Sequence, residues 1–206
     1  MEERRLELLQ VGAEVFASQP FDEVWVNDVA KRAGVSTALL YHYFGSKRGL
    51  LTAILDRGWT TIEARVNAVD SNDAPVDRLL SVLEAVVVEL ENDSDLKNLM
   101  VLEAGRVRKD NRDVIVSQGF HHFAEVVSSI LTEMRDRGQI ASSLNLDAVS
   151  AAVIGMTAGL LRNQVLGQRS EFRADYSADD LRKVLGAMIS AFASGRVQQP
   201  LRAVNG

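Results

Sequence analysis

Apolar residues recur at helical spacing along most of this 206-residue chain. In the first segment they form one stripe, made of Leu6, Leu9, Ala13, Phe16 and Ala17, as in a helix with a single buried face. Only three prolines interrupt the pattern, and no segment shows the one-by-one alternation of a half-buried strand. These features predict an all-α fold of about nine helices without a sheet.

Local capping signals set the predicted helix ends. Gly34 stands where a left-handed C-terminal cap belongs, Ser36 is a side-chain N-cap, and Ser177 with Asp180 forms a capping box. The predicted helices are 4–18, 27–33, 37–44, 46–69, 75–90, 96–103, 114–137, 147–168 and 177–193.

The composition is that of a folded soluble protein and excludes functions that depend on cysteine. The chain is 47% hydrophobic and 25% charged, which is typical of a folded soluble protein, and it has no cysteine for disulfides or thiol chemistry. Charged residues break up the apolar ones at the N-terminus, so we expect neither a signal peptide nor a membrane span, and a cytoplasmic location.

Catalysis has little support in the sequence. There is no Gly-rich phosphate loop and no Ser-His-Asp pattern in a strand-turn context. His121 and His122 are neighbours, and on a helix they point about 100° apart rather than toward one metal ion. We therefore expect no enzyme, no metal site and no cofactor.

Charge is distributed unevenly along the chain. The formal net charge is −5, yet residues 24–51 hold four basic residues against Asp28 alone, a balance of +3 that leaves −8 elsewhere. A basic island on an acidic body is expected where one end of a protein meets an anionic polymer. A solvated helix surface would carry the same residues, so charge alone leaves both explanations open.

The stretch GVSTALLYHYFGSKRGLL, residues 34–51, contains a turn motif. Two short helices separated by Gly-Val-Ser predict a helix-turn-helix, whose second helix can lie in the major groove of DNA. Leu40 and Phe44 are four residues apart and should face the small core. The outward side chains are then Thr37, Ala38 and His42, flanked by Tyr41 and Tyr43.

These outward groups have the chemistry of a DNA contact. Thr37 and His42 can hydrogen-bond to base edges, the Ala38 methyl can meet a thymine methyl, and tyrosine hydroxyls can reach phosphates. Ser46 is followed at once by two cations, where the helix dipole already disfavours positive charge. A phosphate at that helix end would compensate, which predicts Lys47 as a phosphate contact.

The stretch VNDVAKRAGVSTALLYHYFGSKRGLL resembles the DNA-binding signature of the TetR family of transcriptional regulators. The shared features are Ala-Gly-Val-Ser after a short helix, then Leu-Tyr-x-x-Phe, then Ser-Lys and a leucine pair. The resemblance covers most of the first 55 residues and implies base contacts from Thr37, Ala38 and His42, and phosphate contacts from Tyr41, Tyr43 and Lys47. It also implies that Asn27 reaches into the groove. We include Ser36, the N-cap of the second helix of the motif, among the predicted DNA-binding residues.

Two positions depart from the family pattern. Family members usually carry threonine where Trp25 stands, a hydroxyl that caps the second helix and can bind phosphate. We expect Asn27 to cap that helix instead, with a shifted start. Leu39 occupies a position often held by a small or hydroxylated residue, so no DNA contact is assigned to it.

The resemblance also implies a homodimer, because a single helix-turn-helix neutralises few phosphates. The last two predicted helices carry small residues and an apolar stripe, which such proteins use as a four-helix dimer interface. The predicted interface residues are Ala151, Gly155, Ala158, Gly159, Leu181, Leu185, Met188 and Phe192. Packing within one chain is the alternative for both helices.

Similar proteins bind a small molecule inside the helical body and release DNA when its helices shift. The candidate ligand-binding residues are Trp59, Met100, Glu103, His121, Phe123 and Met156. A carboxylate and a histidine among Met and aromatic groups would suit an amphipathic ligand. Taken singly, Met and aromatic residues are more often core, and Glu and His more often surface.

We therefore expect a helix-turn-helix domain at 1–50, a ligand-binding and dimerisation domain at 51–195, and a flexible tail at 196–206. The expected function is that of a homodimeric, ligand-responsive regulator, a repressor that binds palindromic operator DNA and is released by a small molecule. The alternatives are a constitutive architectural DNA binder without a ligand, and a helical protein-interaction dimer that no longer binds DNA.

Overall fold

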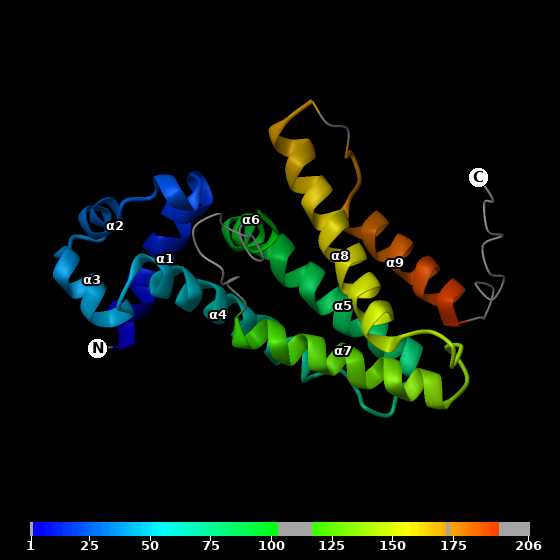
Figure 1. The fold of residues 1–206 in the computed structure, drawn as a ribbon. Helices are drawn as coiled ribbons and strands as arrows, with labels where there is room; N and C mark the ends of the chain where they lie inside the picture. The colour runs from blue at the N-terminus through cyan, green and yellow to red at the C-terminus, as the bar shows by residue number, and fades with distance from the viewer. Residues whose placement is uncertain (1, 103–116, 172–173, 194–206) are drawn as a thin grey trace, which may run out of the picture. The chain divides into compact units, whose positions relative to one another are not determined.

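The computed structural model describes residues 2–102, 117–171 and 174–193 (Figure 1). Over these residues the chain forms nine α-helices and one 3-10 turn, η1, with no strand. Their bounds are α1 Glu2–Ser18, η1 Phe21–Glu23, α2 Val26–Arg32, α3 Thr37–Phe44, α4 Lys47–Val66, α5 Pro75–Asn92, α6 Ser94–Leu102, α7 Gln118–Asp136, α8 Leu146–Arg169 and α9 Ala178–Ala193. The predicted all-α fold is confirmed, and the predicted tail lies outside the described residues.

Helix ends follow local capping in most places. At α9, the Ser177 hydroxyl accepts from the Asp180 N–H at 3.2 Å and the Asp180 carboxylate accepts from the Ser177 N–H at 2.9 Å, which confirms the capping box. The helix α6 begins two residues earlier than predicted, because the Asp93 carboxylate accepts from the Leu96 N–H at 2.9 Å. The predicted start of α7 at residue 114 lies outside the described residues.

Packing divides the chain into two compact units. The first comprises residues 1–64 and 89–121, and the second comprises residues 65–88 and 122–206. The division therefore passes through α4, α5 and α7. The domain boundary predicted at residue 50 lies inside α4 and stays a prediction.

The core of the first unit is built from α1, α2, α3 and the first half of α4. Its fully buried side chains include Leu8, Leu9, Val29, Leu40, Leu50 and Leu51. Each such side chain contributes roughly 1.5–3 kcal/mol through removal from water. Leu99 of α6 belongs to the same cluster, and α6 packs on α1. One core thus supports both helices of the predicted helix-turn-helix and α6.

The second unit is a helical body of α5, α7, α8 and α9. Buried side chains on these helices include Leu79, Leu83, Ile130, Leu131, Val153, Leu161, Leu181 and Leu185. A half-buried ion pair joins Arg78 of α5 to Glu133 of α7 at 2.6 Å. The helices α8 and α9 pack on each other, and the Gln164 side chain donates to the Tyr176 carbonyl at 3.3 Å in their connection.

The helix α8 is long and apolar. By length and mean hydropathy alone, Leu146–Gln168 would also suit a membrane span. Core helices of soluble proteins share these properties, and α8 contributes buried side chains to its unit. Packing within the second unit therefore accounts for the apolar composition of α8.

Candidate nucleic-acid interface

The turn between α2 and α3 is closed by backbone hydrogen bonds. Gly34 has φ 64°, the left-handed conformation that favours glycine. The Val35 N–H donates to the Ala30 carbonyl at 2.9 Å and the Gly34 N–H donates to the Lys31 carbonyl at 3.2 Å. Both bonds satisfy carbonyls left open at the end of α2. The predicted C-terminal cap at Gly34 is confirmed.

The helix α3 starts where the sequence predicts. The Ser36 side chain accepts from the Leu39 N–H at 3.2 Å, so Ser36 is the N-cap. Leu40 is fully buried against the small core, as predicted, together with Val29 and Ala30 of α2. The small side chain of Ala30 lets α2 and α3 pack on each other at this point.

The outward face of α3 is formed by residues three and four apart. Ala38, Tyr41 and His42 are exposed, Tyr41 to 47%. Thr37 and Tyr43 are half-buried at its edges. Helical spacing therefore presents one methyl, one phenol and one imidazole together, the groups that reach base edges and phosphates.

Asn27 has a different role from the one expected. The helix α2 begins at Val26 with Trp25 as its N-cap, and no side chain caps it. The Asn27 side chain instead accepts from the Thr37 hydroxyl at 2.8 Å. The expected cap by Asn27 is wrong, because its amide oxygen lies beside α3, where Thr37 offers a hydroxyl donor. This bond ties the start of α2 to the start of α3.

The junction between α3 and α4 is tight. Gly45 ends α3 with φ 71°, and the Ser46 hydroxyl accepts from the Gly49 N–H at 2.9 Å at the start of α4. A Cβ on Gly49 would lie 2.0 Å from the Phe44 carbonyl oxygen. Only glycine therefore lets the first turn of α4 pass so close to the end of α3.

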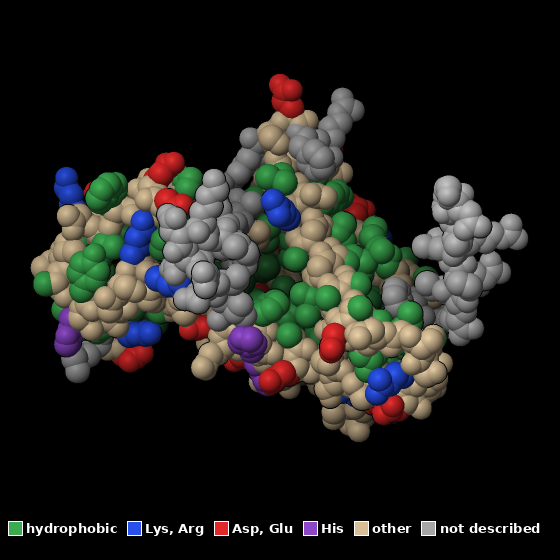
Figure 2. Space-filling view, in the orientation of Figure 1, with side chains coloured by type: hydrophobic (Ala, Val, Ile, Leu, Met, Phe, Trp, Pro, Cys, Tyr) green, Lys and Arg blue, Asp and Glu red, His purple; other side chains and the backbone are tan. Residues whose placement is uncertain are grey.

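Lys47 lies at the start of α4 and its ammonium group is held by η1. Its Nζ lies 4.5 Å from the centroid of the Phe21 ring and donates to the Asp22 carbonyl at 3.4 Å. A cation over an aromatic face is favoured by the ring quadrupole. This contact fixes where the ammonium group stands, and Figure 2 shows Lys and Arg side chains over the region of α1 to α4.

The predicted ligand residues of the first unit pack in separate places. Trp59 is buried and contacts Phe120 edge to face, with ring centroids 5.8 Å apart. Met100 is half-buried against the core that supports the helix-turn-helix. His121 is exposed, and Glu103 lies outside the described residues.

The remaining two ligand candidates belong to the second unit. Phe123 is buried and Met156 is half-buried. Both placements also fit ordinary core packing.

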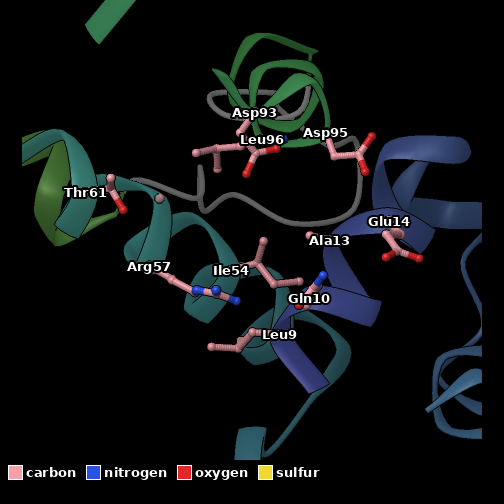
Figure 3. A pocket seen from close by; sticks show the side chains of 11 residues that line it. Leu9, Gln10, Ala13, Glu14, Ile54, Arg57, Thr61, Asp93, Asp95 and Leu96 are labelled. Atoms are coloured by element: carbon pink, nitrogen blue, oxygen red, sulfur yellow. Dashed lines mark hydrogen bonds between the residues drawn. The ribbon is translucent and has the colours of Figure 1, made fainter. Parts of the chain in front are cut away.

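A hollow of about 330 Å³ in the first unit has other lining residues (Figure 3). Leu9 and Ile54 lie at its apolar part, while Arg57, Asp93 and Asp95 bring charge to it from α4 and from the start of α6. The described candidates for ligand binding are absent from its lining. Sequence reasoning did not single out this hollow, since its residues come from three separate segments.

The predicted dimer residues of α8 lie on an open face. Ala151, Gly155 and Ala158 are exposed and Gly159 is half-buried. A Cβ on Gly155 or Gly159 would meet no atom within 4 Å. Within the described chain, therefore, packing does not require glycine at either position. Glycine nevertheless weakens a helix by roughly 1 kcal/mol relative to alanine.

The predicted dimer residues of α9 lie on two different sides. Leu181 and Leu185 are buried inside their own unit. Met188 is 48% exposed, as is its neighbour Val184 to 43%. The side chain of Phe192 lies outside the described part of the chain. The surface that α9 offers is therefore centred on Val184 and Met188, and Figure 2 shows hydrophobic side chains over α8 and α9.

Two features of the interface were missed from the sequence. Gly49 was not singled out, although a glycine inside a predicted helix is a signal for close approach. The position of Phe21 beneath Lys47 had no signal, because the two residues are far apart in the chain.

Comparison with known proteins agrees with this geometry. The family model described as bacterial regulatory proteins, tetR family, matches residues 8–54, from α1 to the middle of α4. That range includes the whole helix-turn-helix, its Gly34 turn and the α3–α4 junction.

Among proteins of known name, the HTH-type transcriptional repressor KstR2 of Mycobacterium tuberculosis is 28% identical over 149 residues, 71% of this chain and 74% of that protein. The nucleoid occlusion factor SlmA of Marinomonas sp. is 22% identical over 172 residues, 83% of this chain and 86% of that protein. Another similar transcriptional regulator is matched over only 52% of its own length.

Solved structures share the fold. The transcriptional regulator FadR from Bacillus subtilis, in complex with stearoyl-CoA, superposes with a TM-score of 0.75 at 19% identity, covering 90% of this chain and 97% of that one. The likeness extends past the matched helix-turn-helix into the helical body. The match over residues 8–54 and the relatives above confirm the predicted resemblance to the TetR family of transcriptional regulators, whose DNA-binding signature this chain carries.

Proposed function

We propose that this protein binds double-stranded operator DNA by inserting α3 into the major groove. The observation that carries the proposal is the exposed face of Ala38, Tyr41 and His42, which α3 presents from a buried core, together with the ammonium group of Lys47 that is anchored over Phe21 at the start of the next helix. Thr37, Ala38 and His42 would meet base edges, and Tyr41, Tyr43 and Lys47 would meet phosphates. Ser36 would contribute by fixing the start of α3, and Asn27 by holding Thr37.

The active form in this proposal is a homodimer. A dimer places two recognition helices at half-sites about 34–36 Å apart, so the operator is palindromic. The open glycines of α8, with Val184 and Met188 of α9, support a face where a second copy packs closely. Leu181 and Leu185 are not part of that face, since they already pack inside the chain.

The DNA affinity is controlled by a small molecule bound in the helical body. A ligand that favours the state unable to bind DNA lowers operator affinity, and operator lowers ligand affinity by the same factor. Phe123 and Met156 are the candidate ligand contacts in this body, and Trp59 of the first unit is a separate candidate. A complex with stearoyl-CoA is described for the relative of similar fold, and a repressor among the relatives supports repression here.

The named relatives are not enzymes, and the proposed site is a DNA-binding surface without a catalytic role. The protein would act in the cytoplasm on chromosomal DNA, with no membrane as partner. A constitutive DNA binder without a ligand remains the second candidate, because the relative matched over 83% of this chain is a nucleoid occlusion factor. A dimer unable to bind DNA is less well supported, since α2 is regular behind Trp25.

The test is a mobility shift with the intergenic DNA beside the coding sequence, at two salt concentrations and with random DNA as competitor. A sequence-specific shift with one or two dimers per site is expected. A screen for compounds that abolish the shift then separates the two candidates, because a constitutive binder would respond to none. A folded dimer that binds operator and random DNA equally well would contradict the proposal.

A further inference from the structure

A single side-chain hydrogen bond joins the starts of α2 and α3. The Thr37 hydroxyl donates to the Asn27 amide oxygen at 2.8 Å, across ten positions of the sequence. Asn27 is exposed, and Thr37 is half-buried at the edge of the outward face of α3. The bond lies at the surface, where water could serve both groups, so burial does not require it.

The packing of the two helices holds the partners of this bond in place. Val29 of α2 and Leu40 of α3 are fully buried in one core. The Ser36 side chain caps α3 directly before Thr37 and so fixes where that helix begins. Neither helix can turn about its axis without loss of buried contacts, so Asn27 and Thr37 stay side by side.

The direction of the bond decides what Thr37 can offer to DNA. A threonine hydroxyl has one proton to donate and two lone pairs that accept. A hydroxyl that is free to rotate pairs with either a keto oxygen or an amino group, so threonine alone reads both kinds of base. Here the proton is directed to Asn27. Toward DNA, therefore, Thr37 presents an acceptor.

The bases differ in the groups that would meet this acceptor. In the major groove adenine and cytosine present amino groups, which donate, whereas guanine O6 and thymine O4 are keto oxygens, which accept. We infer that Asn27 is a positioning residue: by holding the Thr37 proton, it makes Thr37 select the exocyclic amino group of adenine or cytosine in each half-site. This inference rests on the DNA-binding function proposed above and adds a base specificity to it.

The first experiment locates the base that Thr37 reads. A randomised library of double-stranded DNA is selected with wild-type protein and with Thr37→Val, which keeps the shape of the side chain and removes the hydroxyl. The half-site position whose preference disappears in the variant is then tested with all four base pairs in mobility shifts. Wild type should favour an amino base on one strand by about tenfold, because a keto base forfeits the hydrogen bond and leaves two acceptors unpaired.

The second experiment removes the amino group alone. Purine replaces adenine, or 2-pyrimidinone replaces cytosine, at the position found above. Wild-type protein should lose affinity for this DNA by about tenfold, the effect of one unpaired acceptor. Thr37→Val should lose none, and it also controls for any effect of the analogue on the base pair itself.

Variants of Asn27 test whether it acts through Thr37. Asn27→Ala frees the hydroxyl proton, so keto bases become acceptable and the preference should fall to about twofold or less. Asn27→Asp keeps an acceptor oxygen and should keep the preference, although its negative charge weakens binding to every sequence. Added to Thr37→Val, Asn27→Ala should change no base preference further.

A matched control comes from another exposed asparagine. The Asn72 side chain donates to Asp70 at 2.9 Å in the connection between α4 and α5. Asn72→Ala removes a surface hydrogen bond of the same kind and should keep the wild-type base preference. Far-UV circular dichroism of each variant checks that it is folded.

The outcomes separate this inference from the proposed function. If wild type selects a palindrome but Asn27→Ala keeps the full preference, or Thr37→Val alters no position, the inference fails and the proposed function stands. Loss of the preference in Asn27→Asp would also overturn it, because an acceptor at this position would then not be the cause. A wild-type protein that selects no sequence from the library would refute both.

Discussion

Gly49 allows a quantitative prediction about the junction between α3 and α4. A Cβ at this position would lie 2.0 Å from the Phe44 carbonyl oxygen. A carbon and a carbonyl oxygen normally approach to about 3.3 Å, so Gly49→Ala must open the junction by roughly 1.3 Å. That carbonyl accepts from the Ser46 N–H at 2.8 Å, and it cannot move without disturbing this bond.

The cost of Gly49→Ala follows from three terms. Overpacking costs about 1–3 kcal/mol and a weakened hydrogen bond about 0.5–1.5 kcal/mol, while the better helix propensity of alanine returns at most about 1 kcal/mol. The expected net destabilisation is about 2 kcal/mol, or a fall in Tm of roughly 4–8 °C for a chain of this size. DNA affinity should fall further, because the junction sets the position of α3 relative to Lys47.

The assay is thermal unfolding by circular dichroism together with a mobility shift on the same samples. Gly186→Ala in α9 is the matched control, since a Cβ there meets no atom within 4 Å. The control should raise stability slightly, by at most about 1 kcal/mol. If Gly49→Ala leaves Tm and operator affinity unchanged, or raises Tm as the control does, the reasoning about the junction is refuted.

Three further predictions address the DNA surface, the dimer and a helix cap. Lys47→Ala should weaken binding to every sequence and flatten the salt slope by about one, whereas His42→Ala should change base preference; equal losses on operator and random DNA for both would contradict these roles. Gly155→Leu should leave each chain folded, because a side chain at this position points into open space. The variant should be a monomer in light scattering after gel filtration, and a persistent dimer would place the interface elsewhere. The Ser177 hydroxyl, and then its N–H, hold the pKa of Asp180 below its usual 3.8, so the capping box stabilises α9 above that pH and loses this contribution as pH falls through the lower folded value. Ser177→Ala should therefore lessen the loss of stability on acidification below pH 3.8 in pH-dependent unfolding, and an unchanged acid profile would argue against the cap.

Much of the interface could be predicted because its determinants are local. The left-handed turn at Gly34, the cap at Ser36 and the capping box of α9 each depend on hydrogen bonds between residues a few positions apart. The inward position of Leu40 follows from helical spacing and burial. These features are written in short stretches of sequence, so they were available before any tertiary contact was known.

Other features were decided only by tertiary structure. Asn27 bonds to Thr37 instead of capping its own helix, and Lys47 stands over Phe21, in each case through a partner from another segment. The apolar stripe of α9 did not reveal that Leu181 and Leu185 pack inward while Val184 and Met188 stay exposed. Sequence by itself determined the helices, their caps and the family signature, because these depend on neighbouring residues. The choice of partner for each side chain required the fold, because it depends on which distant segments the core brings together.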